Sequence, residues 1–406
     1  MLGWLGILRL GLVQTSLGAV IVLTTSTMNR VMVVELALPA MLPGILVALH
    51  HIVQMSRPRF GYGSDVGGRR TPWIIGGMIV LALGGTGAAL GTALMVSSPG
   101  AGTALAVIAF ILIGLGAGAA GTSLLVLLAK QVPMERKAAA ATIVWIMMIA
   151  GFAVTAGLAG HFLDPFSPRR LVEVTAVVSL AAVMVTLLAL YRLEHRGEAG
   201  SVATASQGGG LSPGFRQALI EVWHEPEARR FTLFVFVSML AYSAQDLILE
   251  PYAGTVFGMT PGQSTQLSGI QHAGVLLGMV VVAVTGTVLR QAGPAVLRYW
   301  TVGGCIASAL ALAGIAFGGS VGTAWPLSAN VFCLGVANGA FAVAAIASMM
   351  TLASHGQARR EGLRMGLWGA AQAIAFGLGG FLGTVAIDVM RQFVAEPAVA
   401  YGLVFS

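Results

Sequence analysis

Polar and ionisable side chains at the ends of long apolar segments are the residues of this sequence best placed to do chemistry. One group, after the first apolar segment, is Asn29, Arg30 and Glu35, and the other, at a later segment, is Gln245, Asp246 and Glu250. Charged groups are costly within a bilayer, so such residues are functional candidates. Arg30 could pair with Asp246 or Glu250. That pair would either close one end of a helix bundle or form part of a ligand or proton site.

Histidine is the second residue type with suitable chemistry. The histidines in or beside apolar segments are His50, His51, His161, His272 and His355. A neutral imidazole nitrogen can bind a metal, including the magnesium at the centre of a macrocycle. A single histidine within a membrane more often makes a hydrogen-bonded contact between helices. No spacing typical of a directly bound metal ion is present.

Other classes of protein fit the sequence poorly. It contains no nucleophile elbow, no P-loop, no zinc-ligand spacing and no paired catalytic carboxylates in an aqueous pocket, so we do not expect an enzyme. The net charge of +7 comes from basic residues in short connections between apolar segments. No nucleic-acid-binding motif accompanies them, and no nucleic-acid partner is expected.

The composition predicts that helices crossing a membrane hold these residues. Of the 406 residues, 57% are hydrophobic and only 9% are charged, whereas a soluble domain carries about 25% charged residues. A span needs about 20 mostly apolar residues. Eleven segments qualify: 10–28, 38–55, 73–96, 104–128, 139–161, 171–191, 231–250, 267–289, 297–318, 326–350 and 365–388. The fold class is therefore an all-α membrane protein.

The spans divide into two halves. Residues 1–191 form a six-span half, and 230–406 form a second half whose last span, near 398–406, stops short of a full crossing. We expect either a clipped sequence or a re-entrant stub there. Residues 192–229 form a linker that is rich in Gly and Ser at 200–210 and amphipathic at 215–223.

Basic residues give the orientation. With the N-terminus in the cytoplasm, 18 of the 22 Lys and Arg residues lie on the cytoplasmic side. This is the bias that the positive-inside rule describes.

The connection after the second span carries the spacing G-x-x-x-D-x-x-G-R-R. Its residues are Gly61, Asp65, Gly68, Arg69 and Arg70. This pattern resembles the signature of major facilitator transporters, in which the loop latches the two halves in one conformation. The basic residue usual after the Asp is Val66 here. The resemblance implies a major facilitator fold of two six-helix halves.

Further stretches resemble one branch of that superfamily, the PucC/LhaA light-harvesting assembly proteins of purple phototrophic bacteria. They lie at 24–36, 48–59, 142–148, 245–252 and 256–259. The 61–73 stretch is closer to the LhaA side, which serves the core antenna around the reaction centre. The resemblance covers essentially the whole chain.

This resemblance implies an assembly factor for the core light-harvesting complex. Such a protein would bind newly inserted antenna α and β polypeptides and reaction-centre–antenna assembly intermediates, and would deliver or channel bacteriochlorophyll to them. It would lie in the bacterial inner, intracytoplasmic photosynthetic membrane among its lipids. The pigment-binding candidates are His51, His272, His50 and Asn29. The pigment's magnesium would be bound through His51 or His272.

Two other functions remain open from the sequence. One is an alternating-access carrier for a pigment precursor, a proton or another small solute, for which the acidic pair Asp246 and Glu250 would be suited. The other is a scaffold that holds antenna helices without pigment. The glycines of the last full span, at 377, 379, 380 and 383, leave room for a ring or a partner helix, or pack the bundle against itself.

Overall fold

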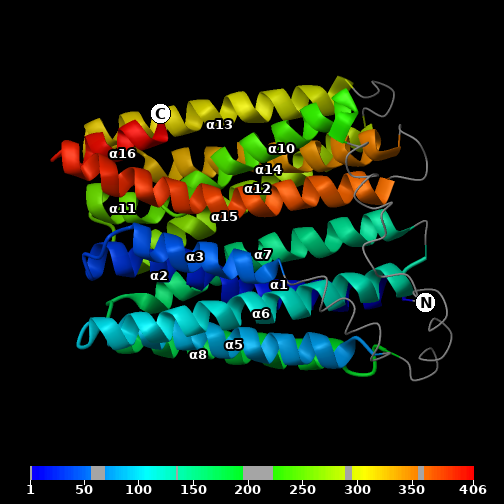
Figure 1. The fold of residues 1–406 in the computed structure, drawn as a ribbon, viewed down its shortest axis with the longest axis horizontal. Coiled ribbons are helices and arrows are strands. Elements are labelled where there is room, and N and C mark those ends of the chain that lie inside the picture. Colours follow the sequence, from blue (N-terminus) through cyan, green and yellow to red (C-terminus); the bar gives the residue numbers. More distant parts are fainter. Residues whose placement is uncertain (1, 56–68, 134–135, 195–222, 289–294, 355–360) are drawn as a thin grey trace.

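Helices are the only regular elements in the part of the chain that this computed structural model describes. That part comprises residues 2–55, 69–133, 136–194, 223–288, 295–354 and 361–406. The helices run along the long axis of the molecule in two groups, the first drawn from blue to green and the second from green to red (Figure 1). The expected all-α fold of two halves is confirmed.

The N-terminal half begins with one long helical segment. It consists of α1 (Trp4–Val22), the π-helical turn η1 (Leu23–Thr27), α2 (Met28–Arg30) and a second π-helical turn, η2 (Val31–Glu35). The other helices of this half are α3 (Met41–Gln54), α5 (Thr71–Leu94), α6 (Pro99–Gln131), α7 (Lys137–Leu163) and α8 (Pro168–Leu190).

The C-terminal half repeats this plan. Its first segment is α10 (Pro226–Asp246) followed by α11 (Leu249–Phe257). The others are α12 (Pro261–Val288), α13 (Ala295–Val321), the short 3-10 turn η5 (Gly322–Ala324), α14 (Leu327–Ser354), α15 (Glu361–Phe393) and α16 (Pro397–Phe405).

Ten helical segments within the described residues are long and apolar enough to cross a membrane, so the chain is a multi-pass membrane protein. The expected second span, 38–55, corresponds to α3, an apolar helix of 14 residues. The expected twelfth corresponds to α16, which has nine residues. The count of eleven spans and a partial twelfth stays a prediction, as does the cytoplasmic N-terminus. Residues 195–222 of the expected linker 192–229 lie outside the described residues.

Two expected spans end later than the apolar runs suggest. The first continues past residue 28 to Glu35, and the seventh continues past residue 250 to Phe257. The reason is that the polar residues at these positions find partners inside the protein. Asn29, Arg30 and Glu250 are all 3% exposed or less, so they do not mark the edge of the membrane.

Several helices start at a proline. Pro99, Pro168 and Pro226 each stand at the first helical position, where a missing N–H leaves no hydrogen bond unmade. Ser167 precedes α8, and its side chain accepts a hydrogen bond from the backbone N–H of Arg170. These start signals set the short connections between neighbouring helices.

Glycines allow the closest helix contacts within each half. A Cβ at Gly335 or Gly339 of α14 would collide with the carbonyl oxygen of Gln271 or Val275 on α12. On α15, Gly379 and Gly383 meet α10 at Leu240 to Ala244 in the same way. These glycines of the last full span therefore pack the bundle against itself, which was one of the two expectations.

The two halves meet through two pairs of helices in particular. The second span of each half packs on the fifth span of the other half, α3 on α15 and α12 on α7. Val33 and Ala40 of the first half also belong to an apolar cluster built mainly by the second half. Leu247 of the second half belongs to the core of the first. The halves are thus joined at the end where η2 and α11 finish, which we call the Arg30 end.

Candidate functional site

The break in the seventh span is the first feature of the Arg30 end. Pro251 has no backbone N–H and cannot donate to the carbonyl four residues earlier, that of Leu247. The helix is interrupted there, between α10 and α11. The Nδ2 of Asn29 donates to the Leu247 carbonyl oxygen at 2.6 Å. Asn29, 1% exposed, therefore satisfies a carbonyl that the proline leaves without a donor.

The π-helical turn η1 supplies two more contacts to the C-terminal half. Ser26 donates to Oε1 of Glu250 on α11, and the hydroxyls of Thr27 and Thr265 lie 3.0 Å apart. Glu250 is 3% exposed, and its Oε2 is a buried atom without a hydrogen-bond partner among the described residues. A π-helical turn widens the helix and is often found at functional sites.

Arg30 is buried at this end, 2% exposed. Its Nη1 donates to Oε1 of Glu35, and its Nη2 donates to the carbonyl oxygen of Met259 at 2.6 Å. The carboxylate that pairs with Arg30 is that of Glu35, rather than that of the expected Asp246 or Glu250. Glu35 is closer because the hydrogen bonds of η2 join residues five apart, which places Glu35 on the same side of the helix as Arg30.

Gly254 makes room for this arginine. A Cβ at residue 254 would lie 3.0 Å from both Nε and Nη2 of Arg30. The guanidinium therefore lies directly against the backbone of α11. Any larger side chain at this position would have to displace an arginine that is held by two hydrogen bonds.

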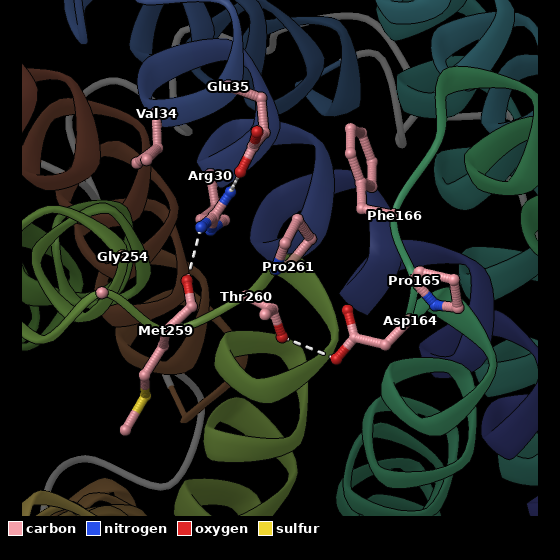
Figure 2. A pocket seen from close by; sticks show the side chains of 11 residues that line it. Arg30, Val34, Glu35, Asp164, Pro165, Phe166, Gly254, Met259, Thr260 and Pro261 are labelled. Atoms are coloured by element: carbon pink, nitrogen blue, oxygen red, sulfur yellow. Dashed lines mark hydrogen bonds and ion pairs between the residues drawn. The ribbon is translucent and has the colours of Figure 1, made fainter.

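A pocket of about 730 Å³ opens at the surface of the Arg30 end, between the two halves. Figure 2 shows Arg30, Glu35 and Phe166 of the first half facing Met259 and Thr260 of the second. The remaining lining residues are Val34, Asp164, Pro165, Gly254, Gly258 and Pro261. The charged pair thus forms part of the pocket wall, and opening this end would expose it.

The other two residues of the expected network lie apart from the Arg30 pair. Gln245 is buried, and its Oε1 has no hydrogen-bond partner among the described residues. Asp246, at the end of α10, is exposed. The structure therefore brings Arg30 and Glu35 together, with Asn29 and Glu250 near them. Asp246 has no ion pair within the part of the chain that the structure describes.

A row of rings crosses between the halves beside Asp246. His50 and His51 of α3 have ring centroids 4.1 Å apart, and His51 stacks on Phe376 of α15 with a centroid distance of 6.3 Å. Phe376 in turn meets the edge of Tyr242 on α10 at 5.9 Å. His50 is buried, whereas His51 is half-buried. His51 is therefore the better placed of the two for a flat ligand.

His272 has the chemistry of a metal ligand. Its Nδ1 lies 2.8 Å from the carbonyl oxygen of Ser268, so Nδ1 carries the proton and donates it there. This leaves the lone pair on Nε2, the arrangement that a ligating histidine needs. His272 is half-buried and meets the edge of Phe152 on α7 at 5.0 Å.

The described part of the expected latch motif, Arg69 and Arg70, lies at the opposite end of the molecule. Gly61, Asp65 and Gly68 are outside the described residues. The backbone N–H groups of Arg70 and Thr71, at the start of α5, donate to the carboxylate of Glu194 at 2.9 to 3.1 Å. Burial alone raises the pKa of Glu194, but these hydrogen bonds outweigh it and hold the pKa below its usual 4.5. Arg69 is exposed.

Sequence reasoning missed several of these residues. Ser26 and Thr27 are ordinary polar residues in an apolar run, and only the contact with α11 and α12 gives them a role. Phe376 and Tyr242 look like any membrane aromatics. Pro251 was a usable signal, because a proline within a span leaves a carbonyl that some side chain must satisfy.

Comparisons with known proteins give matches along most of this chain. A family model described as "PUCC protein" matches residues 27–406. The "Bacteriochlorophyll synthase 44.5 kDa chain" of Rhodobacter capsulatus is 54% identical over 405 residues, which cover 100% of this chain and 92% of that protein. "Protein PucC" of the same organism is 29% identical, over 94% of this chain and 83% of that protein.

Solved structures show the same fold at low identity. The crystal structure of a D-xylose–proton symporter superimposes with a TM-score of 0.68 at 15% identity, over 98% of this chain and 94% of that one. At this identity, the likeness concerns the fold alone.

Proposed function

The chain belongs to the PUCC protein family, and from that premise we propose that it assists the assembly of a photosynthetic antenna and delivers bacteriochlorophyll to it. The printed name of one relative, 54% identical to this chain, connects it with bacteriochlorophyll. The fold is that of the major facilitator transporters. Together they support a role in photosynthetic complex assembly or transport, and the delivery of pigment is the finer proposal.

The row of His51, Phe376 and Tyr242 is the observation that carries the pigment-binding part. Bacteriochlorophyll is a flat apolar macrocycle with a central magnesium, and it favours ring faces to stack on and a neutral imidazole nitrogen. The row offers ring faces from α3, α10 and α15, that is, from both halves. A ligand held there would contact both halves at once.

His272 is the second candidate for the magnesium. The hydrogen bond from its Nδ1 to Ser268 fixes the ring and leaves Nε2 as the acceptor nitrogen. His50 is a weaker candidate because it is 2% exposed. The Nδ2 of Asn29 is already used by the Leu247 carbonyl, so it is not the donor for a pigment carbonyl.

The partners follow from the same proposal. Newly inserted antenna α and β polypeptides would meet the lipid-facing helices, and assembly intermediates of the reaction centre and its core antenna would receive them. The membrane would be the bacterial inner membrane, with the N-terminus in the cytoplasm. The excess of basic residues on one side supports this orientation.

A carrier for a pigment precursor or another solute is the second candidate function. Glu250 favours it, because a buried carboxyl at the junction of two transporter halves is suited to carry a proton. An enzymatic role is less well supported. The printed name of one relative contains "synthase", but the residues gathered here hold helices together and offer no paired acid and base.

The test is the pigment content of histidine variants. We expect His272→Ala or His51→Ala to lose most bound bacteriochlorophyll while the protein stays monodisperse. His161→Ala is the matched control, since His161 is an exposed histidine near the end of α7. Full pigment content in both single variants and in the double variant would contradict ligation by these residues. Normal antenna assembly in those variants would favour the pigment-free scaffold.

A further inference from the structure

Two carboxylates bridge the halves at the Arg30 end: Asp164, which also lines the pocket there, and Asp388, which lies outside it. Asp164, directly after α7, accepts hydrogen bonds from Thr260 Oγ1 at 2.6 Å and from the backbone N–H of Gly262 at 3.2 Å. Asp388, near the end of α15, accepts from the backbone N–H groups of Ala40 and Met41 at 2.9 and 2.7 Å.

These two contacts are equivalent in the repeated plan of the fold. Asp164 belongs to the fifth helix of the first half and binds the start of the second helix of the other half, α12. Asp388 belongs to the fifth helix of the second half and binds the start of the second helix of the first, α3. The two contacts therefore occupy equivalent positions in the two halves.

The helices approach closely beside each carboxylate. Four residues before Asp164, Gly160 lies against Gly262, and a Cβ at Gly160 would be 2.6 Å from the Gly262 carbonyl oxygen. Four residues before Asp388, Thr384 lies against Gly44 in the same manner. A carboxylate at a helix start is favoured by the free N–H groups and by the helix dipole.

Local helix caps are made within one half, as Ser167 does for α8. Asp164 and Asp388 differ because each caps a helix of the opposite half. Their hydrogen bonds exist only while α7 stays on α12 and α15 stays on α3 at this end. Separation of the halves would break both contacts, together with those of Asn29 and Thr27.

We propose that Asp164 and Asp388 are a matched pair of latches that hold the Arg30 end closed, and that losing both lets this end open. These latches would act in the same way whatever cargo the protein carries. It gives the protein two states, with a defined set of contacts that must break between them.

The experiment measures access to a residue that the closed end covers. Val33 is 4% exposed and packs in the apolar cluster of the second half. In a background with Cys305 and Cys333 replaced by Ala, Val33→Cys reacts with a membrane-impermeant maleimide only when the end opens. Ser97→Cys, exposed between α5 and α6, gives the intrinsic rate of the reagent.

We expect Asp164→Asn and Asp388→Asn each to raise the labelling rate at residue 33 about tenfold, and the double variant to raise it further. Glu173→Gln is the matched control, because Glu173 pairs with Arg169 on the same helix and does not bridge the halves. Its rate should equal that of the parent.

Parent-like labelling in the double variant would overturn the proposal, as would an equal increase in Glu173→Gln. Gel filtration shows whether each variant is folded. If the double variant does not fold, the two single variants decide the matter, because each removes one latch and leaves the other in place.

Discussion

The link between Asn29 and Pro251 makes a quantitative prediction. Replacing Asn29 by Leu keeps the size of the side chain but removes the donor to the Leu247 carbonyl. That carbonyl would then be buried with no donor, which costs about 1–3 kcal/mol. The Oδ1 of Asn29 is buried with no hydrogen-bond partner among the described residues, so removing it offsets part of that cost. We expect Asn29→Leu to lower the free energy of unfolding by about 1–2 kcal/mol.

Pro251→Ala provides the internal test. An alanine restores the backbone N–H that can donate to Leu247, four residues earlier. In this background the Leu247 carbonyl no longer needs Asn29. The cost of Asn29→Leu should therefore fall by at least half, which a double-mutant cycle measures directly.

The assay is reversible unfolding by SDS in mixed micelles, followed by circular dichroism, for the parent, both single variants and the double variant. If Asn29→Leu costs the same with and without Pro251, the account of the broken span is refuted. If Asn29→Leu has no cost in the parent, the hydrogen bond to Leu247 contributes nothing to stability.

Two further predictions concern the contacts at either end. Gly254→Ala should destabilise the protein by about 1–2 kcal/mol, because its Cβ would displace Arg30, which two hydrogen bonds hold in place. Gly157→Ala is the control in the same unfolding assay. Its Cβ would enter open space, so it should be neutral or stabilising. The pKa of Glu194 in the folded protein lies below its usual 4.5. The ionised carboxylate therefore stabilises the fold above pH 4.5, and this contribution is lost as the pH falls through the folded-state pKa. The difference in melting temperature between the parent and Glu194→Gln should therefore be largest near pH 7 and shrink in acid, and a difference that grows in acid would contradict the hydrogen bonds to Arg70 and Thr71.

The overall fold was predictable because it depends on long apolar runs and on a division into two halves. The histidines and the charged residues near the ends of the first and seventh spans were also identifiable by type. Their partners were not. Arg30 pairs with Glu35 because η2 is π-helical, and an apolar run gives no sign of a π-helical turn.

Contacts between the halves were the least predictable. Asp164 and Asp388 each lie more than 90 residues from the helix that they cap. Nothing local distinguishes them from ordinary polar residues at the end of a span. The role of Asn29 is an intermediate case, since Pro251 requires a donor but does not say which residue supplies it.

The central claim is that the protein itself holds bacteriochlorophyll. Its most direct test is pigment extraction and an absorption spectrum on the protein purified in mild detergent from phototrophically grown cells, before and after removal of bound antenna polypeptides. The account predicts stoichiometric bacteriochlorophyll that stays with this chain when the antenna polypeptides are gone. Pigment that leaves entirely with those polypeptides would contradict it.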